Sequence, residues 1–174
     1  GPFHESYRGQ RVTEGKLGPV HIWDETESTN DLARDLAERG APHGSLVIAK
    51  RQTAGRGRLG RVWSDGGHGN AIASLVLRPT LAPVDAPLLC MAAAVSIQEI
   101  CGEPIGVKWP NDLLGPDLKK VAGILAEMEL SKAKIDFVVL GFGVNLVQAP
   151  QLETASTLSA YGIHFEPAAF ARQC

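Results

Sequence analysis

Short apolar segments separated by glycine- and proline-containing turns constrain the fold of this chain most. Such segments, each with the apolar content of a strand, lie at 20–23, 46–49, 71–77, 105–108 and 135–142. Residues 113–130 add a pattern typical of a hairpin around a Gly-Pro-Asp turn. Runs this short favour strands over helices, and strands outnumber helices. The sequence therefore predicts an α+β fold, with a mixed or antiparallel β-sheet covered by helices and not a doubly wound sheet.

Three segments have the pattern of helices. Apolar residues at helical spacing follow Ser28 or Thr29, either of which is a suitable N-cap, and Gly40 follows the expected end. Residues 87–101 are apolar and rich in alanine, so we expect a mostly buried helix there. A third helix is expected to begin at 167–172.

Length and composition exclude several classes of protein. With 174 residues and 44% hydrophobic content, we expect one domain over 19–174, preceded by a flexible lead-in over 1–18. The 17 basic and 19 acidic residues argue against bulk binding to nucleic acid or membrane. No run approaches the ~20 apolar residues of a membrane span, and no signal peptide is evident. The three cysteines and five histidines lack metal-ligand spacing, so we expect no metal site and a cytoplasmic location.

One loop, Arg51–Trp63, concentrates positive charge between two expected strands. Five cationic side chains and no acidic one lie between Lys50 and Arg61. Glycines bring backbone N–H groups close to an anion, and arginines bind phosphate or carboxylate through paired hydrogen bonds. The loop is therefore predicted to bind an anion.

The glycines of this loop fit no common nucleotide motif. Their spacing matches GxGxxG, but residues 62–70 do not favour the helix that should follow. A P-loop is excluded because Arg61-Val62 stands where Lys and Ser/Thr are required. From the loop alone, a solvated linker or an Arg/Gly segment for nucleic acid remain open.

A second cluster, Lys108–Asp112, places a cation, an aromatic ring, an amide and a carboxylate at a strand end, and two lysines precede the apolar run 121–125. Together these motifs resemble the biotin protein ligases, also called biotin–[acetyl-CoA-carboxylase] ligases. The resemblance extends over roughly residues 20–146 and rests on Glu27–Asn30, Gln52–Trp63, Lys108–Asp112, Lys120–Leu125 and Gly141–Asn145. It implies a catalytic domain with the fold of class II aminoacyl-tRNA synthetases.

The resemblance implies a two-step reaction. Biotin and ATP, with Mg²⁺, give biotinyl-5'-AMP, and a lysine of a biotin carboxyl carrier domain then takes the biotinyl group. Implied partners are that carrier domain and a homodimer, with no nucleic acid and no membrane. The residues implied in catalysis are Lys120, Arg56, Arg58 and Lys108. Those implied in biotin binding are Ser28, Thr29, Asn30, Gln52, Arg56, Gly57, Arg58, Lys120, Gly123, Gly141 and Gly143, and those implied at the adenylate are Trp63, Asn111 and Asn145.

Four details of the site follow from the same residues. Asp112 is a candidate general base, although an ion pair with Lys108 is the more common role for such a carboxylate. The turn before Lys120 is one residue longer than usual, and the spacing to the following Ala-Gly favours Lys120 over Lys119. The loop is expected to be mobile when empty and to close over the ligand. No metal ligand set is expected.

The length sets further expectations. About nineteen residues precede the first strand, so we expect no DNA-binding winged helix, and the small C-terminal domain usual in the family is expected to be absent. The alternatives are a lipoate or octanoate ligase and a truncated biotin-binding module without catalysis.

Overall fold

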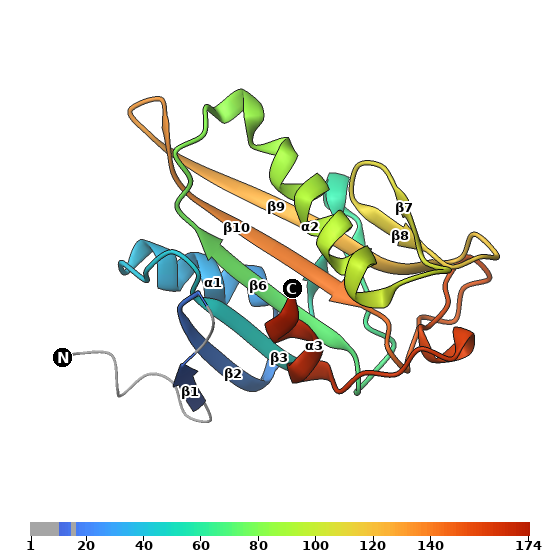
Figure 1. The fold of residues 1–174 in the computed structure, drawn as a ribbon. Helices are drawn as coiled ribbons and strands as arrows, with labels where there is room; N and C mark the ends of the chain where they lie inside the picture. Colours follow the sequence, from blue (N-terminus) through green and yellow to red (C-terminus); the bar gives the residue numbers. More distant parts are fainter. Residues whose placement is uncertain (1–10, 15–16) are drawn as a thin grey trace.

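A computed structural model describes residues 11–14 and 17–174, and its centre is an eight-stranded sheet (Figure 1). The strand order is β1-β2-β3-β6-β10-β9-β8-β7, and of the neighbouring pairs only β2 and β3 are parallel. The strands are β1 (Arg11–Glu14), β2 (Pro19–Thr26), β3 (Leu46–Gln52), β6 (Ala71–Leu77), β7 (Gly106–Lys108), β8 (Asp112–Leu114), β9 (Lys120–Ser131) and β10 (Lys134–Val144). The predicted mixed sheet is therefore confirmed, and each predicted strand overlaps an observed one.

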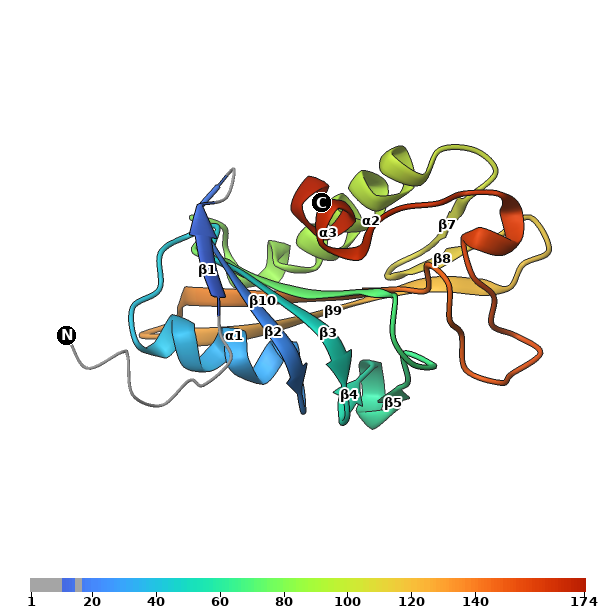
Figure 2. The same ribbon diagram turned by 90° about the horizontal axis from the view of Figure 1, so that it is seen from below.

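Helices cover both faces of this sheet. Helix α1 (Thr29–Glu38) lies on one face, and α2 (Pro87–Cys101) and α3 (Pro167–Gln173) lie on the other (Figures 1 and 2). The helical spacing of Ala33, Leu36 and Ala37 buries one side of α1 against Val47 and Phe137. A larger apolar cluster fills the space beneath α2 and α3.

Helix α2 is less buried than the sequence suggested. Its buried residues are Ala94, Ile97 and Cys101, whereas Leu88 and Val95 are 54% and 49% exposed. The expectation of a mostly buried helix is therefore wrong, because α2 packs on the sheet along one side only. Counted with the short 3-10 turn η2 (Pro83–Asp85), Pro83–Cys101 spans 19 residues with a mean hydropathy of 1.5, long and apolar enough by composition to cross a membrane. This departs from the expectation that no run approaches that length.

The Arg/Gly loop folds into a small ribbon on the α1 side of the sheet. Strands β4 (Gly55–Arg56) and β5 (Val62–Trp63) pair with each other, and the 3-10 turn η1 (Arg58–Gly60) joins them (Figure 2). Leu59 at the tip has a φ of 59°, a left-handed backbone conformation that is uncommon for a branched residue. The loop thus projects beside the N-terminus of α1.

Loop anchors and chain ends complete the fold. The Asn70 side-chain oxygen accepts hydrogen bonds from the backbone N–H groups of Leu146, Val147 and Gln148. These bonds join the loop before β6 to the segment that follows β10. A last 3-10 turn, η3 (Ser159–Tyr161), precedes α3. Within the expected flexible lead-in, residues 11–14 form edge strand β1, and residues 1–10 and 15–16 lie outside the described residues.

Candidate active site

A cavity of about 50 Å³ lies where the start of α1, the β4–β5 ribbon and the middle of β9 and β10 meet. It gathers residues from every motif that the sequence analysis singled out. The lining residues are Ser28, Thr29, Asn30, Gln52, Arg56, Gly57, Arg58, Trp63, Ile72, Asn111, Lys120, Gly123, Ile124, Gly141, Phe142 and Gly143. All residues predicted for biotin binding are therefore brought together, and their individual roles stay predictions.

One end of the cavity is polar because α1 begins there. Ser28 is the N-cap residue but makes no side-chain cap, so the first amides of the helix need other acceptors. The Gln52 side-chain oxygen, from the end of β3, accepts the N–H of Thr29 at 2.8 Å. Ser74 Oγ on β6 lies 2.8 Å from Thr29 Oγ1 and 2.6 Å from Asn30 Oδ1. Thr29, Asn30 and Ser74 are almost fully buried, and the half-buried Gln52 joins them in one connected network.

Glycines leave the space that these side chains occupy. A Cβ atom at Gly141 would overlap the Asn30 amide, and one at Gly143 would lie 2.6 Å from the Trp63 indole. A Cβ at Gly123 would lie 2.9 Å from the same ring. These glycines of β9 and β10 therefore leave room for the side chains of Asn30 from α1 and Trp63 from β5 to lie against the sheet.

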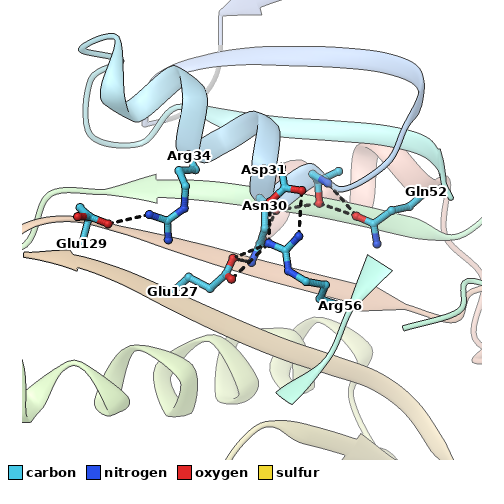
Figure 3. Close-up of polar contacts among 9 residues, drawn as sticks. Asn30, Asp31, Arg34, Gln52, Arg56, Glu127 and Glu129 are labelled. Carbon is cyan, nitrogen blue, oxygen red and sulfur yellow. Dashed lines mark hydrogen bonds and ion pairs between the residues drawn. The ribbon is translucent and has the colours of Figure 1, made fainter. Parts of the chain in front are cut away.

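The guanidinium group of Arg56 is held by two carboxylates (Figure 3). It donates to both oxygens of Asp31 on α1, at 2.9 and 2.7 Å, and lies 3.2 Å from Glu127 on β9. Hydrogen bonding to Asp31 is the main cause that raises the pKa of Arg56 above its usual value. Arg56 therefore fastens the ribbon to α1 and β9, and its charge is locally compensated.

The other end of the cavity carries Arg58 and Lys120. Arg58 donates to the Asn111 side-chain oxygen at 3.2 Å, which joins the ribbon to the strand end before β8. Lys120 Nζ lies 2.9 Å from Asp112 Oδ1 and 5.3 Å from the centre of the Trp63 ring. The expected ion-pair partner of Asp112 was Lys108; the structure pairs Asp112 with Lys120 instead.

Lys120, which the sequence favoured over Lys119, lines the cavity, whereas Lys108 is exposed on β7 and lies outside the lining. A second cavity, of about 160 Å³, shares Trp63 and Lys120 with the first. Asn145, predicted at the adenylate, lines this second cavity together with residues of the segment 150–155. Lys120 therefore stands at the junction of two cavities.

Two buried polar atoms face this junction without a hydrogen-bond partner among the described residues. They are Trp63 Nε1, a donor, and Asn145 Oδ1, an acceptor. Buried polar groups are nearly always paired in the functional state of a protein. Both atoms are consistent with a polar ligand at this place.

The sequence analysis missed Asp31, Ser74 and Glu127. The sequence could have indicated Ser74, because it is the one polar residue in the apolar strand 71–77. A hydroxyl buried in such a strand needs a hydrogen-bond partner. Glu127 gave no such indication, since a glutamate on an alternating strand ordinarily faces solvent. Its contact with α1 depends on long-range folding.

Comparison with known proteins connects this geometry to one family. The sequence pattern of the biotin/lipoate A/B protein ligase family matches residues 23–145. The chain is 41% identical over 131 residues to the bifunctional ligase/repressor BirA of Bacillus subtilis. It is 40% identical over 156 residues to the biotin–[acetyl-CoA-carboxylase] ligase of Mycobacterium tuberculosis.

Solved structures agree with the sequence matches. A biotin protein ligase from Leishmania major in complex with biotinyl-5-AMP superimposes with a TM-score of 0.73 at 26% identity, over 88% of this chain and 70% of that one. The Aquifex aeolicus enzyme in complex with biotin and ATP gives 0.68 at 32% identity, over 88% and 66%. The match with the Bacillus protein covers 73% of this chain but 40% of that protein. The match with the Mycobacterium protein covers 84% of this chain but 56% of that protein, so this chain spans about half the length of these relatives.

Proposed function

Because the chain belongs to the biotin/lipoate A/B protein ligase family, we propose that it activates biotin with ATP and then attaches it to a carrier lysine. The first step joins the biotin carboxylate to the α-phosphate of ATP, giving biotinyl-5'-AMP and pyrophosphate. The second step transfers the biotinyl group to the amine of a lysine in a biotin carboxyl carrier domain and releases AMP. The observation that carries this proposal is the pair of cavities that meet at Lys120.

The polar end of the first cavity suits the ureido ring of biotin. That ring offers one carbonyl acceptor and two N–H donors, and hydroxyl and amide side chains of Thr29, Asn30 and Gln52 complement them. Ile72, Ile124 and Phe142 would pack against the apolar remainder of the ligand.

The phosphate transfer would take place at the junction. A carboxylate and a phosphate must approach each other there, and fixed cations lower the cost of that approach. Arg58, which contacts the neutral amide of Asn111, and Lys120, which pairs with the single carboxylate of Asp112, would supply that charge. Arg56 is compensated by two carboxylates, Asp31 and Glu127. Trp63 and Asn145 would hold the adenosine in the second cavity.

The small volume of the first cavity supports a movement of the ribbon on ligand binding. Drug-sized ligands occupy pockets of roughly 300–1,000 Å³, far more than the 50 Å³ present here. The hydrogen bond between Arg58 and Asn111 joins the ribbon to the opposite side of the lining, so its release would loosen the ribbon for biotin to enter and its return would help to exclude water. This mobility, expected from the sequence, stays a prediction.

Magnesium would enter with ATP. Within residues 11–14 and 17–174 no three His, Cys, Asp or Glu side chains gather where they could hold a metal ion. Mg²⁺ usually keeps several waters and binds through substrate phosphates, so such a cluster is not required. For the transfer step, Asp112 is a weak candidate for a base because it is paired with Lys120.

A homodimer and a cytoplasmic location complete the proposal. The part of β9 beyond Ile124 has no strand on one side among the described residues, because β8 ends its pairing with β9 at Gly123. Such an edge can pair with a second copy. We also expect the protein to bind neither nucleic acid nor membrane, because its basic and acidic residues are nearly balanced in number.

The reaction of the purified protein with ATP and a purified biotin carboxyl carrier domain tests this proposal. We expect attachment to the carrier with biotin and not with lipoate. Attachment of lipoate instead would identify a lipoate or octanoate ligase, and binding of biotin with no adenylate formed would identify a non-catalytic binding module.

A further inference from the structure

The carboxylate of Glu127 lies just outside the cavity lining, at one end of a hydrogen-bonded network that includes Thr29 and Asn30 of the lining (Figure 3). Asn30 Nδ2 donates to Glu127 Oε2 at 2.8 Å, and Asn30 Oδ1 accepts from Ser74 Oγ at 2.6 Å. Ser74 Oγ also lies 2.8 Å from Thr29 Oγ1. The four side chains come from α1, β6 and β9, so the network crosses the centre of the fold.

Counting protons shows which atoms of this network are left as acceptors. An ionised carboxylate only accepts, so the amide of Asn30 must turn its NH₂ group toward Glu127 and its oxygen toward Ser74. Asn30 Oδ1 is then an acceptor that takes the single proton of Ser74. The single proton of Thr29 Oγ1 then has two acceptors within reach, Ser74 Oγ at 2.8 Å and the side-chain oxygen of Gln52 at 3.2 Å. With either acceptor the proton is used inside the protein, and Thr29 Oγ1 keeps lone pairs for a ligand.

We propose that Glu127 is a positioning residue that makes the cavity present hydrogen-bond acceptors, at Thr29 Oγ1 and Asn30 Oδ1, to the N–H groups of its ligand. This rests on the proposed function, because the two ureido N–H groups of biotin are the donors that match. Arg56 also donates to the Glu127 carboxylate at 3.2 Å, which holds that side chain beside Asn30. Glu127 itself need not touch biotin.

The neighbouring Glu129 provides a matched control. It lies two residues along β9 on the same face and pairs with Arg34 of α1 at 2.8 Å, whereas the hydrogen bond from Asn30 goes to Glu127. Glu127→Gln allows the side chain to donate as well as accept, which removes the fixed direction. Glu129→Gln makes the same chemical change without reaching the network.

Calorimetric titration with biotin, and with biotin methylated on a ureido nitrogen, tests the proposal. Because unmatched buried acceptors are costly, wild-type protein should prefer biotin by roughly 100-fold, and Glu127→Gln should bind biotin about tenfold more weakly with a preference of only about tenfold. Glu129→Gln should match wild type. Ser74→Ala, a small change that leaves Glu127 and Arg56 paired, should reduce the preference in the same way.

Three results would overturn the assignment. Glu127→Gln could behave like Glu129→Gln, or it could weaken both ligands by the same factor, as a general loss of structure would. Ser74→Ala could retain the full preference. Failure of wild-type protein to bind biotin would instead contradict the proposed function, and the assignment with it.

Discussion

Gly143 and Gly141 on β10 offer a pair of equivalent substitutions that separate the two ends of the site. Both are buried, and each faces the side chain of a different site residue. A Cβ atom at Gly143 would lie 2.6 Å from Cε2 and Nε1 of Trp63, whereas non-bonded carbon atoms sit about 3.5–4.0 Å apart. Gly143→Ala therefore requires the indole ring to move by roughly 1 Å.

Overpacking of this size costs about 1–3 kcal/mol, which corresponds to a loss of roughly 5- to 150-fold in binding. If Trp63 holds the nucleotide, Gly143→Ala should raise the KM for ATP by that factor and change the Kd for biotin much less. Gly141→Ala displaces Asn30 and should show the opposite pattern. Pyrophosphate release at varied ATP, with biotin titration calorimetry, measures both constants. The same pattern of losses in both variants would refute this division of the site.

Three further predictions concern catalysis, pH and packing. Lys120→Ala should lower pyrophosphate release by at least about 100-fold while the thermal unfolding midpoint stays close to wild type, and wild-type release would contradict its role. Burial raises the pKa of the Cys101 thiol from 9.0 to about 11, so the folded state holds this proton more tightly. That stabilisation is complete below pH 9 and is lost as the pH rises from 9 to 11, by up to about 3 kcal/mol; denaturant titrations should show a smaller alkaline loss in Cys101→Ala. Ile97→Ala should cost about 2–5 kcal/mol in unfolding free energy and Val95→Ala less than about 1, and equal costs would contradict the one-sided packing of α2.

The strands and the gathering of the motifs were predictable from sequence because both depend on local patterns. Apolar runs bounded by turns marked the strands, and the resemblance covered most of the residues that line the cavity. The orientation of α2 was not predictable, since an almost uniformly apolar helix carries no periodic signal for the side that it buries. The partners of Arg56 and Asp112 were missed for a related reason. Asp31 is 25 residues from Arg56 in sequence and Glu127 is 71 residues away, so only the folded sheet brings them together.

If the two cavities meeting at Lys120 hold biotin and ATP, the protein forms biotinyl adenylate there. Thin-layer separation of the products formed by purified protein, biotin, Mg²⁺ and ATP labelled at the α-phosphate tests it most directly. We expect a labelled biotinyl adenylate that depends on biotin, does not form with lipoate and is lost in Lys120→Ala. An adenylate that forms equally well in Lys120→Ala, or none in wild-type protein that binds both ligands, would contradict it.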